Sequence, residues 1–446
     1  MVALSTPEAL CYRLPWRLLW KKVTDPMSDY HRFVPPMGTA RYAGLTHSQI
    51  LHSLPTHRTE GWKSRLGSLR AEPFKGITTD GEVVPGLFAL RDEGAPTALI
   101  LEAVATLLSA LTPEQLKAVQ HPIDSIDRRK WVNEVPRYER YGIWLDEVTP
   151  AVRDAAMGVL CASLSAAGYE RSRNIMRLNG VLGELVGAPI ALGEYCYQMH
   201  LFGEPSASEP WGWQLYGHHL CLTCFVVGTQ MTLTPTFMGA EPRYADTGPH
   251  AGIRVFDDEE RIGLDLVRSL SAAQQRKAIV HDTTIANGLP PGRHQGADGM
   301  SFGGAFKDNA VVPYEGIAGA ELDPWQRRVL LELTERYLST LPPGPLRAHM
   351  SDVERHIAQT NFCWAGGIDE QSAFYYRIQS PVVMIEFDHH KGVLLTNDTP
   401  QRFHVHTIVR TPNGNDYGMD LLRLHYETSP HHRQQSGNHH HGRSGR

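Results

Sequence analysis

Apolar and polar positions change their spacing several times along the chain, and each change marks a different kind of element. From residue 96 the apolar residues recur at helical spacing, and Thr97 and Thr149-Pro150 are typical helix starts. Two later blocks contain runs with the alternation typical of strands. The pattern predicts helices over 96–190 and 255–360, strands over 195–240 and 361–410, and a terminal helix over 417–428.

Strand blocks that are separated by helical blocks favour an α+β fold over a regularly alternating α/β fold. We expect two blocks of mainly antiparallel strands, with helices packed between and around them, in one large interleaved domain over 96–428. Residues 1–95 have no strong period and are interrupted by prolines, so short strands and loops are predicted for this N-terminal extension. The polar, His-rich tail 429–446 is predicted to be disordered.

A helix-capping pattern recurs three times. In each copy Ser, Thr or Asp is followed three residues later by Gln, so that both side chains can accept hydrogen bonds from free backbone amides at a helix start. The copies begin at Thr112, Ser271 and Asp323. They predict three helix starts, which arose by convergence or by duplication of a helical unit.

The composition narrows the classes of function. The 446 residues include 43 basic and 48 acidic side chains, with no basic run, which argues against a nucleic-acid or membrane partner. The N-terminus lacks the pattern of a signal peptide, and no stretch of about 18 apolar residues is uninterrupted, so a cytoplasmic location is expected. The expected partner is a small-molecule ligand, and the oligomeric state stays open.

Histidine is the unusual residue type, with 23 copies in the chain. The segment 403–410 contains His404-Val-His406, and the alternation of side chains along a strand puts both imidazoles on one face. Two neutral imidazoles on one face are the start of a transition-metal site. The alternative is a half-buried strand whose polar face lies in water.

A second histidine segment, His218-His219, lies about 180 residues earlier. If Gly228-Thr229 forms a two-residue hairpin turn, His219 shares a face with hydroxyl side chains of the next strand, and His218 faces the core. We therefore expect His219 to join the polar pocket and His218 to be a packed histidine bonded to a carbonyl.

Charged side chains near the His-x-His strand suggest how a site could be completed. Glu386 or Asp388, on the preceding strand, would give a 2-His-1-carboxylate set, the arrangement of non-haem iron sites. The alternative is a salt-bridge ladder between strands. Arg410 and Arg377 are candidates for orienting an anionic substrate, because guanidinium groups bind carboxylates through two hydrogen bonds.

Trp211 and Trp213 share one strand face and are candidates for substrate binding by stacking, although such residues commonly fill a core. The motifs of serine hydrolases, nucleotide triphosphatases, dinucleotide enzymes and zincins are absent from the chain.

These residues favour a metal-dependent enzyme acting on a small polar or anionic molecule, with Fe, Cu or Zn as the divalent transition metal. Because the expected ligands are imidazoles and carboxylates, oxidation at a non-haem centre is favoured weakly over hydrolysis. The alternatives are a non-catalytic ligand-binding module and a metal-free enzyme that uses histidine for acid–base chemistry.

Several longer motifs carry a resemblance to a known family. They begin at Trp211 (WGWQLYGHH), Thr234 (TPTFMGAEP), Tyr376 (YRIQSP), His404 (HVH) and Asp416 (DYGMDLLRLHY). The chain resembles the bacterial and fungal family known as domain of unknown function 3500, over roughly 101–426. The resemblance implies a single family domain and supplies no activity.

Overall fold

The computed structural model describes residues 29–429. Its strands are β1 (Gln120–His121), β2 (Ile143–Trp144), β3 (Tyr197–Phe202), β4 (Trp211–Gly217), β5 (Leu220–Val227), β6 (Gln230–Ala240), β7 (Ile279–His281), β8 (Ile317–Ala318), β9 (Asn361–Gly366), β10 (Phe374–Gln379), β11 (Met384–His390) and β12 (Gln401–Arg410). The α-helices are α2 (His47–Ser53), α3 (Thr56–Ala71), α4 (Thr97–Ala110), α5 (Pro113–Val119), α6 (Pro150–Ser163), α7 (Ala166–Leu185), α8 (Asp257–Ser269), α9 (Ala272–Ala278), α10 (Pro324–Leu338), α11 (Pro343–Arg355) and α12 (Met419–Thr428).

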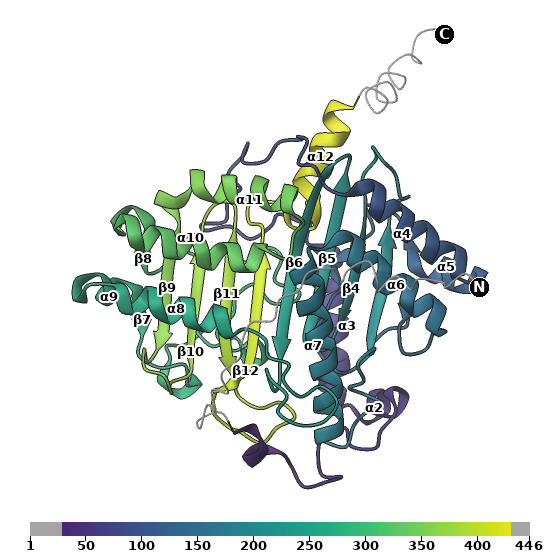
Figure 1. Cartoon of the computed structure of the whole chain (residues 1–446), viewed down its shortest axis with the longest axis horizontal. Coiled ribbons are helices and arrows are strands. Elements are labelled where there is room, and N and C mark those ends of the chain that lie inside the picture. Colours follow the sequence, from purple (N-terminus) through teal and green to yellow (C-terminus); the bar gives the residue numbers. More distant parts are fainter. Residues whose placement is uncertain (1–28, 430–446) are drawn as a thin grey trace, which may run out of the picture.

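All 12 strands belong to one sheet with the order β1-β3-β4-β5-β6-β12-β11-β10-β9-β7, while β2 pairs with β3 and β8 with β9 (Figure 1). Among these strands, β1 with β3 and β7 with β9 are parallel, and the other pairs are antiparallel. The predicted α+β class is therefore confirmed, and the two predicted strand blocks form the two halves of a single sheet.

The halves meet where β6 pairs with β12, in an antiparallel register that sets Gly239 opposite His406 and Phe237 opposite Ile408. Strands far apart in the sequence thus become neighbours at the centre of the sheet. Figure 1 shows α4, α6 and α7 in front of the half that contains β4 to β6, and α8, α10 and α11 in front of the half that contains β9 to β12.

The two faces of the sheet differ in chemistry. The face under the helices is apolar, as alternate residues of β11 and β12 illustrate: Ile385, Phe387, Val405 and Val409 belong to the main core. The opposite face is polar yet also buried, with Glu386, Asp388, His404, His406 and Arg410 each at most 5% exposed. Buried polar groups need hydrogen-bond partners or a bound ligand, so the candidate site is to be sought among the side chains of this face.

The three predicted capping boxes are confirmed at the starts of α5, α9 and α10. In each of them the N-cap side chain accepts the amide of the third helical residue, and that residue's Gln side chain accepts the amide of the N-cap. These starts were predictable because the box is a local device that depends on four consecutive residues.

The N-terminal extension differs from its prediction. In the described part of residues 1–95 the structure has the helices α2 and α3 where short strands and loops were expected. Helix α3 buries only Trp62, Leu66 and Leu69, so its apolar stripe is too sparse to give a clear helical pattern. Apart from residue 429, the predicted disordered tail lies outside the described residues.

Candidate metal centre

Three histidines from the two halves of the sheet converge on its polar face. Ring nitrogens of His219, His404 and His406 all lie within 4.8 Å of one another, and the Nε2 atoms of His404 and His406 are 3.1 Å apart. Metal–nitrogen bonds of about 2.0–2.1 Å let one ion join nitrogens up to about 4.2 Å apart. The closest pair already meets this limit, and the other separations are at most 4.8 Å.

His219 reaches the cluster from a turn rather than from a strand. Gly217 pairs with Leu220, so His218 and His219 form the two-residue connection between β4 and β5. The backbone of His219 has a φ of 63°, in the left-handed region, which costs a non-glycine residue about 1 kcal/mol. Such strained residues concentrate at functional sites.

His219 lies in the cluster, as predicted. The strand register on which that prediction was based is wrong, however. Gly228-Thr229 does form a two-residue turn, and Phe225 pairs with Thr232 as expected. An irregularity between Leu222 and Cys224 then shifts the register, so that Cys221 pairs with Phe237 and no longer with Thr236. The hydroxyl-rich face therefore does not continue to His219.

His218 is the packed member of the pair. Its Nδ1 lies 2.8 Å from the side-chain oxygen of Asn179, and its ring stacks on His219 at a centroid distance of 3.8 Å. The expected carbonyl partner is therefore a side-chain amide from α7. Burial lowers the pKa of His218 to about 3, so the ring is neutral at pH 7.

Gly239 of β6 lies between the two groups of histidines and makes their approach feasible. A Cβ at this position would lie 2.8 Å from the Val405 oxygen, 2.9 Å from His406 Cδ2 and 3.2 Å from His219 Cδ2. Its amide also donates to the His219 oxygen at 2.8 Å. Gly239 could not be identified from the sequence, because a glycine inside a strand pattern does not reveal which side chains come close to its Cα.

His404 is held by a second layer of polar groups. Its Nδ1 donates to the carbonyl of Lys391 at 2.9 Å, which leaves the lone pair of Nε2 facing His406. Glu241 lies 3.6 Å from the same Nδ1 and accepts three backbone amides between Val393 and Leu395. Histidines that bind metals are typically oriented in this way, through the ring nitrogen that does not bind the ion.

The protonation of the cluster suits metal binding. Burial, and then the neighbouring histidines, lower the pKa of His219, His404 and His406 well below the usual range, so all three imidazoles are neutral at pH 7. Neutral imidazole is the form that binds a metal ion. The donor set therefore fits a divalent transition metal.

The predicted carboxylates lie beside the histidines, with their oxygens directed to other groups. Asp388 pairs with His406 across the strands, but its Oδ2 accepts the Met300 amide at 2.7 Å and lies 3.0 Å from His390 Nε2. Glu386 accepts the amides of Phe302 and Gly303 and the hydroxyl of Tyr375. Among the described residues, the group suited to one ion around these strands contains three histidines and no carboxylate.

His390 is a further histidine beside the site, and it was not among the predicted ligands. The structure extends β11 through His390, whose ring centroid lies 3.9 Å from that of His406. His390 follows Asp388 by two residues, so alternation along β11 puts its side chain on the same polar face. Its place in the site depended on where β11 ends, and strand ends are poorly defined by sequence.

The two predicted arginines are buried and form ion pairs within the fold. Arg410 is bonded to Asp308 and Asp416 at 2.7 Å each and to the Gly303 oxygen at 2.9 Å, with no exposed surface. Arg377 is bonded to Glu315 at 2.8 Å and to the Pro313 oxygen at 3.0 Å. Neither guanidinium lines the cleft above the histidines, so their predicted contact with a substrate has no support.

The two predicted substrate-binding tryptophans are part of the core under the helices. Trp211 and Trp213 have no exposed surface. The indole of Trp213 donates to the Ser163 hydroxyl in α6, and that of Trp211 donates to the Ser206 oxygen. Each indole N–H thus has a partner inside the fold, as buried tryptophan requires.

A cleft with a volume of about 760 Å³ opens above the cluster, and His218, His219 and His406 form part of its lining. One wall consists of α3 residues, among them Arg58, Trp62 and Arg65. Clefts of this size hold small-molecule substrates. The N-terminal extension therefore contributes directly to the candidate site.

The aromatic side chains of the cleft pack against one another. Trp62 stacks on Tyr138 at a centroid distance of 4.8 Å and contacts the edge of Phe306 at 5.4 Å. The guanidinium of Arg65 lies over the Phe306 ring at 5.7 Å. These contacts join α3 to the loops on either side of the cleft and make its wall a continuous surface.

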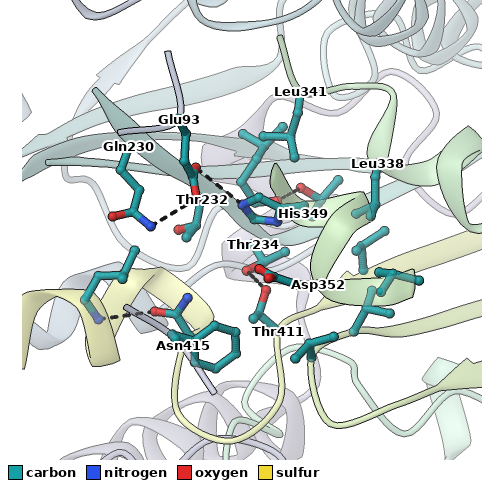
Figure 2. A pocket seen from close by; sticks show the side chains of 18 of the residues that line it. Glu93, Gln230, Thr232, Thr234, Leu338, Leu341, His349, Asp352, Thr411 and Asn415 are labelled. Atoms are coloured by element: carbon teal, nitrogen blue, oxygen red, sulfur yellow. Dashed lines mark hydrogen bonds and ion pairs between the residues drawn. The ribbon is translucent and has the colours of Figure 1, made fainter. Parts of the chain in front are cut away.

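A smaller cavity of about 40 Å³ lies elsewhere, between the N-terminal extension, β6, α10 and α11. Figure 2 shows Thr234 and Thr411 bonded across it, and His349 near Glu93. The space suffices for one or a few water molecules and excludes a substrate. The cleft above the histidines is thus the better candidate for a functional site.

The chain belongs to the family described as Protein of unknown function (DUF3500), whose profile matches residues 93–419. All three candidate ligands lie in this matched region, whereas the α3 wall of the cleft lies before it. A comparison with curated proteins and with solved structures finds no significant match. Over the described residues, none of the helices is long and apolar enough to cross a membrane.

Replacing Gly239 with Ala is expected to disturb the centre, because the added methyl group would meet both His219 and His406. Overpacking of this kind costs about 1–3 kcal/mol of unfolding free energy. Denaturant unfolding and metal titration measure the two effects. Gly67→Ala is the matched control, since a Cβ there meets nothing within 4 Å. Wild-type stability and metal affinity in Gly239→Ala would contradict the geometry.

Replacing Arg410 with Met is expected to lower the unfolding free energy by about 3–5 kcal/mol, since Asp308 and Asp416 would keep buried charges without their cation. The metal content of the folded variant should not change. Arg423→Met, which removes surface pairs with Asp420 and Glu427, should cost about 0–1 kcal/mol. An Arg410→Met protein as stable as the wild type would contradict a structural role.

The buried histidines predict that stability falls in mild acid. Burial lowers the pKa of His218, His219, His404 and His406 below the unfolded value of 6.5, so the unfolded chain binds more protons below that pH. Each histidine then removes about 1.4 kcal/mol per pH unit from the unfolding free energy. Glu241 acts in the opposite direction, because burial raises its pKa to about 7. Its protonation therefore offsets one histidine.

Denaturant unfolding of chelator-treated protein at about pH 7.5 and pH 5.5 measures this dependence. The expected loss is several kcal/mol, and it should be smaller in the double variant His404→Gln/His406→Gln, which lacks two of the titrating groups. An unfolding free energy that does not change between the two pH values would show that these rings are not held neutral.

Proposed function

We propose that the protein is a metal-dependent enzyme that acts on a small anionic molecule, with His219, His404 and His406 as metal ligands. The observation that carries the proposal is the convergence of three neutral imidazoles, two of which, His219 and His406, line a cleft. A divalent ion held there would supply a Lewis acid and would lower the pKa of a bound water.

The charges of the cleft favour an anion. Four cationic side chains line it (Arg41, Arg58, Arg65 and Lys307), against two carboxylates (Glu134 and Asp298). Arg58 and Arg65 share Glu134, and Lys307 pairs with Asp298 at 2.9 Å. Arg41 has no carboxylate partner among the described residues and contacts the ring of Tyr42. The excess of positive charge, together with a metal ion, would attract and orient a negatively charged substrate.

The ligand set favours hydrolysis or a related reaction of an activated water. Three histidines with an open position are the ligands of a zinc enzyme that activates water. Oxidation at an iron centre would require a carboxylate ligand, and the oxygens of Glu386 and Asp388 are directed to other partners. Oxidation at an iron centre remains the second candidate, because Asp388 lies directly across from His406.

The test is metal content together with metal-dependent activity. A chain that ends after Ser429 lacks the five tail histidines at 431–441, which would otherwise bind metal without specificity. We expect the wild type to hold one more metal ion per chain than His404→Ala/His406→Ala, measured by elemental analysis of both truncated proteins. Hydrolysis of small anionic esters by the zinc-loaded protein should fall to background in the same variant.

His200→Ala is the matched control, since His200 is also fully buried in a strand of the same sheet but lies outside the cluster. It should lose stability without losing the metal. A truncated protein that binds no metal while its three histidines are intact would contradict the proposal. Activity with iron and oxygen, and none with zinc, would favour the second candidate.

A further inference from the structure

A second group of potential metal ligands lies outside the cleft, where the N-terminal extension meets the family domain. His47 is the first residue of α2, Asp146 follows β2, and Cys196 directly precedes β3. Cys196 Sγ lies 3.9 Å from His47 Nε2 and 3.7 Å from Asp146 Oδ2, and these latter two atoms are 3.7 Å apart. Three different donor atoms thus form a nearly equilateral triangle.

The triangle has the dimensions of a tetrahedral zinc site. Bonds of about 2.0–2.3 Å from zinc to nitrogen, oxygen and sulfur place pairs of ligand atoms about 3.4–3.6 Å apart. The observed separations exceed these values by a few tenths of an ångström. Sulfur, imidazole and carboxylate are also the ligand types that zinc prefers.

The sulfur of Cys196 lies among polar groups: the Gly193 amide, the Ile190 oxygen and the Asp146 carboxylate. The Gly193 amide donates to the sulfur at 3.1 Å. Such an amide hydrogen bond supports negative charge on sulfur once an ion is bound.

The charge balance also permits an ion. Asp146 is paired with Arg137 at 2.6 Å, and Arg137 in turn lies 3.3 Å from Glu147. The other Asp146 oxygen, Oδ1, is buried and has no hydrogen-bond partner. A zinc ion would be neutralised by the thiolate and the Asp146 carboxylate, while Arg137 would keep Glu147 as its counter-ion.

We propose that His47, Asp146 and Cys196 bind a single zinc ion, with water as the fourth ligand. The side chains of His47 and Asp146 are 14% and 24% exposed, which gives that water access. The ion joins α2 to the family domain at β2 and β3. Because α3 follows α2 and forms a wall of the cleft, this site secures that wall in place, and it does not depend on the proposed enzyme activity.

Cobalt substitution of the full chain tests the site. A thiolate bound to Co²⁺ gives a charge-transfer band in the near ultraviolet, and histidine ligands in the cleft or the tail do not give this band. After chelation and addition of Co²⁺, the wild type should show the band with an intensity that saturates at one thiolate-bound ion per chain. Zinc should displace it.

The band should disappear in Cys196→Ser. In His47→Gln, the apparent affinity for Co²⁺, followed through the band, should fall at least 10-fold. Cys224→Ser is the matched control for a buried thiol and should keep the band. The double variant His404→Ala/His406→Ala should keep it too, so failure of the proposed enzyme and failure of this site are distinguishable. Absence of the band in the folded wild type, or its survival in Cys196→Ser, would overturn the proposal.

Discussion

The antiparallel pairing of β6 with β12 is the interaction on which the rest of the structure depends. It joins two strand blocks that are separated in the sequence by four helices, and it sets Gly239 opposite His406. Without it the molecule would have two separate sheets, and His219 would not meet the His-x-His strand. A slip of one residue would turn His404 and His406 to the apolar face, so the apolar core also fixes the site.

The second constraint is that the polar face of the sheet is buried. Each charged group on it has a specific partner, as Arg410 has in Asp308 and Asp416, and Glu386 in two backbone amides and Tyr375. The three histidines differ, because they direct ring nitrogens toward one another. Three neutral imidazoles whose ring nitrogens converge are suited to bind one metal ion.

The sequence could predict what depends on neighbouring residues. The α+β class, the three capping boxes and the shared face of His404 and His406 follow from spacing within short segments, and all appear in the structure. Helix α3, which forms a wall of the cleft, was not predicted, because only three of its residues are apolar and buried. Arg410, Trp211 and Trp213 were assigned to the site by residue type, whereas the depth of burial determined their actual partners.

Features that depend on contacts between distant segments were not predictable. The register shift in β5–β6 and the left-handed backbone of His219 each alter which way a side chain points. Gly239 leaves room for His219 and His406 because it has no Cβ. This role can be recognised only after β5, β6 and β12 are known to be neighbours. The site is therefore a property of the assembled sheet.

The most direct test of the central claim is anomalous diffraction, at the metal's absorption edge, from crystals of the metal-loaded protein. The account predicts one strong peak on the polar face, about 2.0–2.2 Å from ring nitrogens of His219, His404 and His406. Crystals grown with the metal in which these three imidazoles contact each other and no ion would contradict it.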